Sequence, residues 1–524
     1  ALFILSRFME QVKLQEIAHG KSEETKWLVI KNTTLLSAHN ILVSGLTIAA
    51  ALGGLAILPV PFLSTIGIAF CVGACSAVFI AMTLMPSLLL VFYDFFSVQT
   101  ECSAIKNKCC GKGKKGKYAD ADYNDDDEDT GLVDAERSPK TLQEFDDRER
   151  KRQYSSVWFK IGSYSNKHPL LISFLVLAVA APFFYYASTL KVDFDLFHQV
   201  PRDSPHAAVL KTITTEVGHG ATTPFYVTFT TKEEGGVLNN DVFDIVNDVT
   251  QKICERTGQP LERVLSFSYP PGLGFINATQ AEWLMTAPYV GQAYMFLFNR
   301  TVSDNRQAGL IGLYTTFDPF SSVANKYLDT VHEVIEGADT RGLVEIGLLG
   351  ASADSWSIMR KVMELFPIQI GITFAVIFFF IAVVFRSAFI PFRMVFTVAY
   401  TVAFAFGFGV LLFQFDGVHK LWTALDGVVS YSWTVPIMAF SLLCALALDY
   451  DVFLLTRVIE YKRMGFNNEA AISKAVWKTG RIISFAGVIM AITFGSLMFS
   501  NTTMLNQFGA IASFAVLLDT FIVS

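Results

Sequence analysis

An aspartate inside a long apolar run is the residue of this chain best placed to do chemistry. Asp449-Tyr450 lies in the run 433–457, eight residues before Arg457, which puts the carboxyl roughly 12 Å deeper than the arginine at about 1.5 Å per residue. If the run spans a membrane, an ionised aspartate at that depth costs about 2.5–3.5 kcal/mol. Burial disfavours the charged form, so Asp449 is a candidate to bind and release a proton, with the Tyr450 hydroxyl placed to hold the carboxylate or gate its water. The alternative is a structural aspartate that is hydrogen-bonded within a helix bundle.

The ten residues that follow Tyr450 repeat the first ten residues of the chain. The shared pattern is F-x-x-x-R-x-x-E, formed by Phe3, Arg7 and Glu10 in residues 1–10 and by Phe453, Arg457 and Glu460 in residues 451–460. Each copy ends one apolar stretch and leads, after a polar segment, into two more. Duplicated units around a midplane site are the plan of many transporters. We therefore expect a fragment of a larger transporter, in which a counterpart of Asp449-Tyr450 precedes Ala1.

Two further acids lie close to or inside apolar runs. Asp451 is about 200° around a helix from Asp449, so it cannot share that face, and we expect it in a watery crevice on the cytosolic side. Asp519 lies in the last apolar run, where either a secondary role in a proton relay or a packing and hydrogen-bonding role is open. The Arg and Glu of each repeat are most simply an interfacial anchor and its partner.

The composition is that of a membrane protein: 52% of the 524 residues are hydrophobic, 17% are charged and 47 are Phe. Runs long enough to cross a hydrocarbon core of about 30 Å occupy roughly 40–60, 65–95, 168–188, 365–385, 390–413, 433–457 and 481–499, and another begins near 505. Lys and Arg gather in alternate connections between these runs. The excess of positive charge on the cytosolic side of membrane proteins then places 96–160 in the cytosol and 189–360 outside.

The predicted organisation is a multi-pass membrane protein in seven parts. These are the tail of a transmembrane helix (1–9), a cytosolic connection (10–39), two transmembrane helices (40–95), a disordered cytosolic linker (96–160), an interfacial segment and transmembrane helix (161–188), an extracytoplasmic domain (189–360) and a five-helix transmembrane block (361–524). Strand-like runs such as 225–229 and 310–314 alternate with helix-like runs such as 242–253 and 323–335, which indicates an α+β or split βαβ domain in 189–360.

The predicted linker is rich in charge and poor in apolar residues, which is typical of disorder. Cys109 and Cys110 follow a basic stretch, so they are candidates for palmitoylation in a membrane clamp; the alternative is a solvated linker between two halves. In the predicted extracytoplasmic domain, Asn277 and Asn299 open N-x-T sequons and are candidate glycosylation sites.

No pattern in the sequence indicates an enzyme, a cofactor, a metal site or nucleic-acid binding. The eight His residues are scattered, and the seven Cys residues show neither metal-ligand spacing nor a disulfide framework. The phosphate-binding pattern G-x-x-x-x-G-K-[ST] is missing, which argues against direct ATP drive. The Gly/Lys-rich stretch near residue 115 lies in the linker without a following strand or helix, so it does not indicate a nucleic-acid site.

Several short segments together give the chain a family resemblance. It resembles the MmpL branch of the resistance–nodulation–division (RND) superfamily over nearly all its length outside the 101–160 loop. The segments that carry the likeness are Asp449-Tyr450 with Phe453, Arg457 and Glu460, Val43-Ser-Gly-Leu-Thr47, Phe62-Leu-Ser-Thr-Ile-Gly67, Met85-Pro86, Val200-Pro-Arg-Asp-Ser204, Asp318-Pro-Phe-Ser321 and Leu518-Asp-Thr-Phe521. The family usually has Gly where this chain has Ala445, a small residue that still permits close helix packing. The acidic loop, its cysteine pair and the sequons suggest a eukaryotic host.

The resemblance implies proton-driven movement of lipids or other hydrophobic molecules by a twelve-span protein in two halves, each with an outer porter domain. It makes Phe453, and Phe3 as its repeat partner, part of a hydrophobic lock beside the proton relay, although plain core packing explains Phe453 equally well. One alternative is a Patched- or Dispatched-like lipid mover, which the single cysteine of the outer domain, Cys254, disfavours. A second is a sterol-sensing-type regulatory membrane protein that signals through the cytosolic loop. Cargo identity, direction of transport, the membrane concerned and oligomeric state are not encoded in any of these features.

Overall fold

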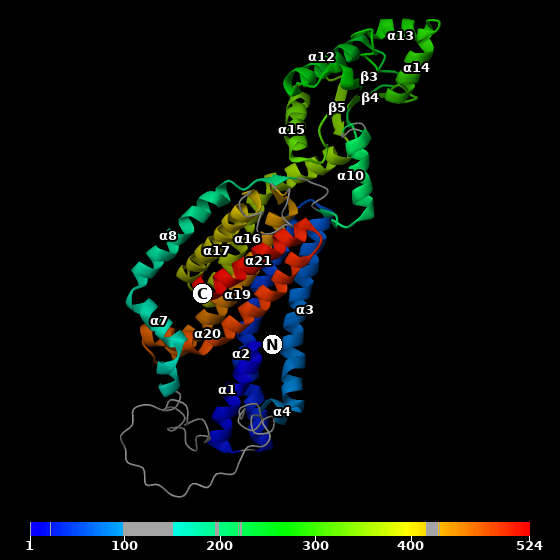
Figure 1. The fold of residues 1–524 in the computed structure, drawn as a ribbon. Helices are drawn as coiled ribbons and strands as arrows, with labels where there is room; N and C mark the ends of the chain where they lie inside the picture. The colour runs from blue at the N-terminus through cyan, green and yellow to red at the C-terminus, as the bar shows by residue number, and fades with distance from the viewer. Residues whose placement is uncertain are drawn as a thin grey trace, which may run out of the picture.

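The computed structural model describes residues 2–20, 22–97, 150–193, 199–217, 220, 223–415, 428 and 430–523. A helical bundle carries a smaller α/β domain at one end (Figure 1). This arrangement confirms the predicted fold class, a polytopic helical protein with an α+β domain. Cys109, Cys110 and most of the predicted linker lie outside the described residues.

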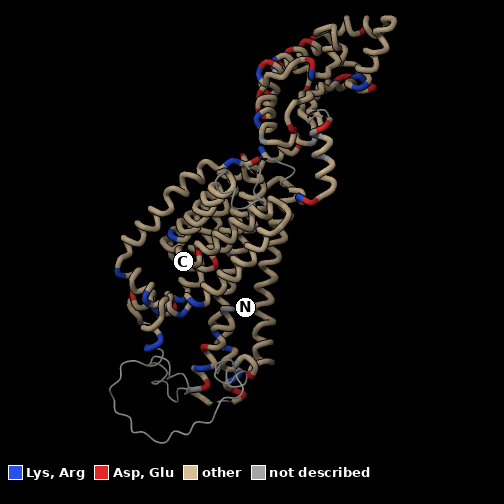
Figure 2. The backbone as a smooth tube through the Cα atoms, in the orientation of Figure 1, with Lys and Arg blue, Asp and Glu red and all other residues tan. Residues whose placement is uncertain are grey.

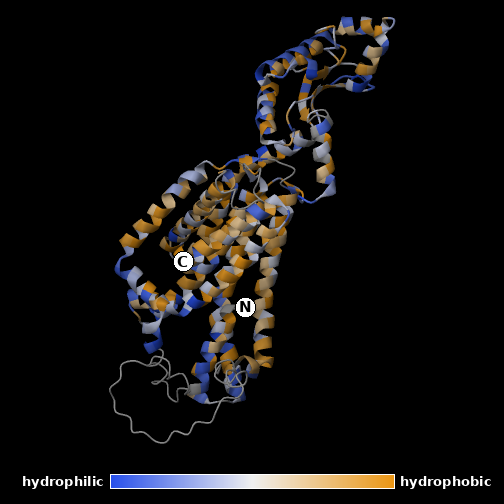
Figure 3. Cartoon of the chain, in the orientation of Figure 1, coloured by the Kyte–Doolittle hydropathy of each residue, from blue (hydrophilic) through white to orange (hydrophobic). Residues whose placement is uncertain are grey.

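Eight helices in the described part of the chain are long and apolar enough to cross a membrane. They are α2 (Glu23–Gly53, extended by the 3-10 turn η1, Gly54–Ile57), α3 (Pro61–Val91), α8 (Pro169–Ser188), α16 (Ala351–Phe385), α17 (Phe389–Gln414), α19 (Thr434–Arg463), α20 (Asn468–Gly495, extended by η5, Ser496–Phe499) and α21 (Thr503–Leu518, extended by the π-helical turn η6, Asp519–Val523). Figure 3 shows apolar residues along these helices, and Figure 2 shows that charged residues gather mainly beyond their two ends.

Two prolines and one residue in a left-handed conformation explain three helix boundaries. Pro61 and Pro169 stand in the first turns of α3 and α8, where a missing N–H costs nothing. At the C-terminal end of α16, Arg386 adopts φ +50°, a left-handed conformation that terminates the helix before α17 begins.

Three shorter helices lie at the end of the bundle far from the α/β domain (Figure 1): α1 (Leu2–His19), α4 (Tyr93–Ser97) and α7 (Val157–Lys167). The last of these packs against α20, where glycine permits close approach. A Cβ atom on Gly480 would lie 2.8 Å from the Trp158 ring. A hydrogen bond of 3.0 Å from Asn166 Nδ2 to Ser473 Oγ fixes the other end of α7.

The helix that carries Asp449 is the centre of the bundle. In the most apolar stretch of α19, 72% of the residues are buried, whereas in the corresponding stretch of α3 none is. Small residues such as Ala439, Ala445 and Ala447 are buried on α19 and allow α2, α17, α20 and α21 to pack around it. Most polar residues of α19 are therefore surrounded by protein, whereas most of α3 lies on the surface of the described structure.

The α/β domain is built on a four-stranded antiparallel sheet with the order β3-β4-β2-β5. Its elements are α10 (Pro205–Val217), β2 (Phe225–Thr231), α12 (Asn240–Thr257), η3 (Leu261–Arg263), β3 (Val264–Ser266), α13 (Ala278–Thr286), α14 (Val290–Thr301), β4 (Ala308–Leu313), α15 (Ser322–Glu336) and β5 (Val344–Leu349). A separate parallel pair joins β1 (Val192–Asp193) to β6 (Tyr431–Ser432) beside the bundle.

Alternation along β2 positions the domain core. Phe225, Val227 and Phe229 are fully buried while their neighbours are partly exposed, as expected for a strand with one covered face. The apolar stripe of α12, which includes Phe243 and Val246, joins them in one core. Burial raises the pKa of Cys254, also on α12, to about 11, which makes it an unreactive packing residue.

Candidate functional site

Asp449 lies at the contact between α19 and α2. The Ser44 hydroxyl of α2 donates a hydrogen bond to Asp449 Oδ1. Close packing of α2 on α3 depends on the next residue, Gly45, because a Cβ atom there would collide with Val78 Cγ2. The V-S-G-L-T segment that contributes to the family resemblance thus supplies both a hydrogen-bond donor to the acid and the glycine that lets α3 approach.

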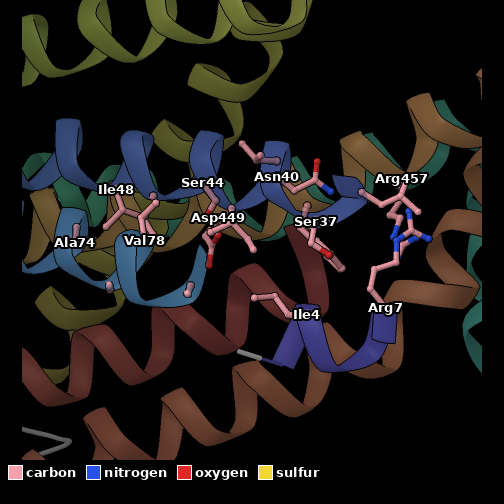
Figure 4. A pocket seen from close by; sticks show the side chains of 17 residues that line it. Ile4, Arg7, Ser37, Asn40, Ser44, Ile48, Ala74, Val78, Asp449 and Arg457 are labelled. Atoms are coloured by element: carbon pink, nitrogen blue, oxygen red, sulfur yellow. Dashed lines mark hydrogen bonds between the residues drawn. The ribbon is translucent and has the colours of Figure 1, made fainter. Parts of the chain in front are cut away.

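A cavity of about 360 Å³ opens beside Asp449, between α1, α2, α3 and α19 (Figure 4). Apolar side chains such as Ile48 and Val78 form its wall near the acid. Arg7 and Arg457 line its far end, and Figure 4 shows Ser37 and Asn40 between Asp449 and these two arginines. The cavity has room for water molecules that could carry a proton past its few polar side chains.

The sequence interpretation missed the polar residues of α2. Ser37, Asn40 and Ser44 are spaced by three and four residues, so they lie on one face of the helix, and all three line the cavity. Ser37 is buried, and its Oγ has no hydrogen-bond partner among the described residues. The signal was available in the sequence as a polar 3–4 spacing that runs into an apolar stretch.

Tyr450 and Phe453 are buried on α19 and pack with Ile483 of α20. The Tyr450 hydroxyl donates to Met490 Sδ at 3.1 Å, and not to the Asp449 carboxylate, which was one of the two roles predicted for it. The reason is helical: consecutive residues point about 100° apart, so Tyr450 faces α20 when Asp449 faces α2. Phe453 also lines the cavity, with the Arg457 guanidinium carbon 5.9 Å from its ring centre. The backbone of Phe3 lies in α1, but its side chain is outside the described part of the structure.

The two R-x-x-E repeats meet in one ionic cluster, which consists of Arg7 and Glu10 on α1, Arg457 and Glu460 on α19, and Lys478 on α20. Each arginine contacts the glutamate of its own repeat, at 2.9 Å in α1 and 3.3 Å in α19. Each also contacts the other repeat: Arg7 binds Glu460, and Arg457 lies 3.6 Å from Glu10. The Arg–Glu pairs of the two repeats, which were predicted as interfacial anchors and their partners, are therefore joined by ion pairs into one cluster at the end of the cavity.

The charge balance of this cluster acts on Glu10. Burial alone would raise the pKa of its carboxyl, but Lys478, Arg457 and Arg7 together outweigh burial and hold that pKa below its ordinary value. Glu10 is thus ionised in the folded protein. The two arginine side chains are 8% and 4% exposed, so both depend on the two carboxylates to compensate their charge.

Asp451 and Asp519 form a second acidic group on the opposite side of α19. Thr397 of α17 donates a hydrogen bond of 2.8 Å to Asp451, and the Arg393 guanidinium lies 3.7 Å from the other carboxylate oxygen. One turn further along α17, the Thr401 hydroxyl is 3.5 Å from Asp519, which begins the π-helical turn. Asp451 is only 4% exposed, so this helix-enclosed position differs from the predicted watery crevice.

The sequon asparagines are exposed in the α/β domain. Asn277 caps α13, where its side chain accepts from the Gln280 backbone N–H at 2.8 Å. Asn299 lies inside α14. Among the described residues, no group of three or more His, Cys, Asp or Glu side chains is arranged to hold a metal ion.

A sequence model of the MMPL family matches residues 1–103 and 199–524. The chain belongs to the MMPL family. The matched residues include both repeats, Ser44, Asp449 and the α/β domain from residue 199 onward, while the gap covers most of the predicted linker, α7 and α8. The match supports an integral, multi-pass membrane protein.

Two curated relatives that match the whole chain are exporters by name. The chain is 22% identical to the "Mycolic acid-containing lipids exporter MmpL11" of Mycolicibacterium smegmatis, over all of this chain and 46% of that protein. It is also 22% identical to the "Apo-petrobactin exporter" of Bacillus anthracis, over all of this chain and 58% of that one. The chain thus spans about half the length of the curated relatives it matches. Among solved structures, SecDF in its "Super-membrane-facing form" aligns with a TM-score of 0.42 and 11% identity, over all of this chain and 52% of that chain. That similarity is too low to carry an argument about function.

Proposed function

We propose that this MMPL protein is a proton-coupled transporter of lipid or other hydrophobic cargo, with Asp449 as the residue that binds and releases the proton. The observation that carries the proposal is the Ser44–Asp449 hydrogen bond beside a cavity that is lined by a row of polar side chains from α2. A carboxylate enclosed by membrane helices is costly, and intramembrane acids mark ion pathways by default.

The row of polar side chains on α2, formed by Ser37, Asn40 and Ser44, gives the proton a route. Ser44 contacts Asp449, and Asn40 and Ser37 lie between Asp449 and the arginines of the ionic cluster, toward the end of the bundle where α1 and α7 lie. Their hydroxyl and amide groups can donate and accept, so they can hold a chain of water molecules. We assign this end to the cytosol and the α/β domain to the opposite side, in agreement with the distribution of Lys and Arg. Phe453 lines the same cavity and lies on α19 between Asp449 and Arg457, so it is placed to control the passage of the proton along this row of polar side chains.

Protonation of Asp449 would change how α19 and α2 interact. An ionised Asp449 accepts the Ser44 hydrogen bond strongly, whereas a neutral carboxyl can itself donate and turn to another partner. A proton that crosses a potential of 100 mV releases about 2.3 kcal/mol, enough to bias two arrangements of packed helices. Asp451 and Asp519, held by Thr397 and Thr401, serve in this proposal as a secondary relay on the α17 side.

The hydrophobic nature of the cargo is inferred from the relatives. By their names, one relative exports mycolic acid-containing lipids and another exports apo-petrobactin. The lipid exporter is the relative that supports a hydrophobic cargo here. The α/β domain is the part of the chain that would contact cargo outside the membrane.

The test is lipid movement by the full-length protein reconstituted in liposomes. We expect an imposed pH gradient to drive the movement of a fluorescent lipid by the wild type and not by Asp449→Asn. Asp304→Asn, an exposed change in the α/β domain, is the matched control and should behave as the wild type. Equal movement by wild type and Asp449→Asn, or movement that ignores the gradient, would leave Asp449 a structural residue and favour a regulatory, sterol-sensing-type protein.

A further inference from the structure

The start of the α/β domain is tied to two membrane helices that are distant in sequence. The Arg202 guanidinium donates hydrogen bonds to Thr503 Oγ1 at 3.0 Å and to Asn506 Oδ1 at 2.8 Å, both on α21. The backbone N–H of Arg202 donates to the Asn501 carbonyl at 2.9 Å, and the Asn501 amide in turn donates to the Asp203 carboxylate. The turn between α20 and α21 therefore holds both charged residues of the V-P-R-D-S segment.

Asn506 is the hub of this contact. It is fully buried, and its amide nitrogen donates to three carbonyls at the end of the α20 segment, those of Leu497, Met498 and Ser500, at 3.2, 2.9 and 2.7 Å. Its oxygen accepts from Arg202. Both ends of one amide are thus used, so the turn cannot move without displacing Arg202 or breaking buried hydrogen bonds.

The next residue of α21 makes a second tie in the same direction. Gln507 is also fully buried, accepts from the Ser432 backbone N–H at 2.9 Å and donates to the Ser430 carbonyl at 2.9 Å. Ser432 belongs to β6, which pairs with β1 on the path from α8 into the α/β domain. The first turn of α21 thus contacts both sides of the entry into the domain.

We propose that Arg202 and the first turn of α21 form a joint that transmits movement of the proton-binding bundle to the α/β domain. This inference rests on the function proposed above. α21 is the element that connects the two: Asn506 lies near its domain end, and Asp519 lies thirteen residues later, roughly 20 Å away at about 1.5 Å per residue. α21 also packs along α19, the helix of Asp449. A shift of α21 reaches the base of α10 through Arg202, which precedes that helix by three residues (Figure 1).

Hydrogen bonds suit a joint better than apolar contacts would. An apolar interface can slide, because its attraction is non-directional. The Arg202 guanidinium is held by two acceptors, and the Arg202 backbone N–H by a third, so the direction of this contact is fixed. A displacement of α21 is therefore transmitted to the α/β domain or breaks hydrogen bonds. Arg202 is therefore a positioning residue that acts through the domain, not a residue that touches the proton or the cargo.

The test separates proton flux from cargo movement in the full-length protein in liposomes. A pH-sensitive dye in the lumen reports proton flux, and a fluorescent lipid reports cargo movement. For Arg202→Ala we expect lipid movement to fall about tenfold while gradient-driven proton flux persists. Arg202→Lys, which keeps a donor, should recover part of the loss. Arg256→Ala, an exposed arginine on α12 of the same domain, should leave both readouts unchanged.

A double-mutant cycle identifies the contact. Thr503→Val removes one acceptor with little change of shape, so it should uncouple less than Arg202→Ala, and the double variant should be no worse than Arg202→Ala alone. If proton flux and lipid movement fall together in every variant, Arg202 has a merely structural role. If lipid movement is unchanged in Arg202→Ala, Arg202 does not couple the bundle to the α/β domain. Either result overturns the inference. Normal transport by Asp449→Asn would instead refute the proposed function, so the two failures are distinguishable.

Discussion

The ionic cluster of the two R-x-x-E repeats gives a sharp prediction about stability. Glu460→Met should destabilise the protein, and adding Arg7→Met should restore part of the loss. The cluster holds three cations and two anions, so removal of Glu460 leaves two buried arginines to share Glu10. Removal of both partners leaves Arg457 and Lys478 with Glu10, at 3.6 and 3.7 Å, which keeps the net charge of the cluster as it was.

The size of the effect follows from distances and burial. At 3.3 Å the Arg457–Glu460 attraction is about 5 kcal/mol at an effective dielectric constant of about 20, before desolvation is subtracted. Loss of one partner of a buried pair typically costs about 3–5 kcal/mol. Because each arginine keeps Glu10, we expect Glu460→Met to cost roughly 2–3 kcal/mol, with a coupling energy of about 1–3 kcal/mol to Arg7→Met.

The assay is reversible denaturation of the purified protein in detergent, applied to both single variants and the double variant. The exposed pair Arg256–Glu333, 3.8 Å apart, provides the control: Arg256→Met should cost less than about 1 kcal/mol. Additive losses of Arg7→Met and Glu460→Met would refute the reasoning, because they would show that the two repeats do not share one set of charges.

Three further predictions concern packing, pH and the second acidic group. Gly45→Ala should cost about 1–3 kcal/mol through its collision with Val78, and Val78→Ala should rescue it, both read from thermal unfolding. A carboxyl whose pKa is lowered on folding stabilises the protein at pH values above its pKa in the unfolded chain, and this contribution is lost as the pH falls through its pKa in the folded protein. The stability due to Glu10 should therefore be fully present above about pH 4.5 and decline below it. Glu10→Gln should lack this decline when denaturation is measured as a function of pH. Asp451→Asn should reduce gradient-driven lipid movement without abolishing it, and full activity of this variant would exclude Asp451 from the relay.

The sequence predicted those parts of the structure that depend on local pattern. Apolar runs indicate membrane helices, and the alternation in 225–229 and the helical spacing in 242–253 correspond to β2 and α12. The repeat of Arg and Glu was visible, and so was the intramembrane Asp449. Each of these features is contained within one segment of chain.

Contacts between segments that are distant in the chain could not be predicted from the sequence. That Ser44 meets Asp449, that the two repeats share charges, and that Arg202 reaches α21 depend on the register between helices, which single-residue patterns do not fix. Tyr450 illustrates the limit. The sequence left open whether its hydroxyl holds the Asp449 carboxylate or gates its water, and the helical turn directs that hydroxyl to Met490 of α20.

The central claim, that Asp449 binds and releases a proton, is tested most directly by infrared difference spectroscopy of the reconstituted full-length protein between acidic and alkaline pH. We predict a protonated-carboxyl stretching band in the wild type that titrates over the pH range in which lipid movement is driven. This band should be lost in Asp449→Asn, while bands from other acids remain. An identical difference spectrum for wild type and Asp449→Asn would contradict the claim.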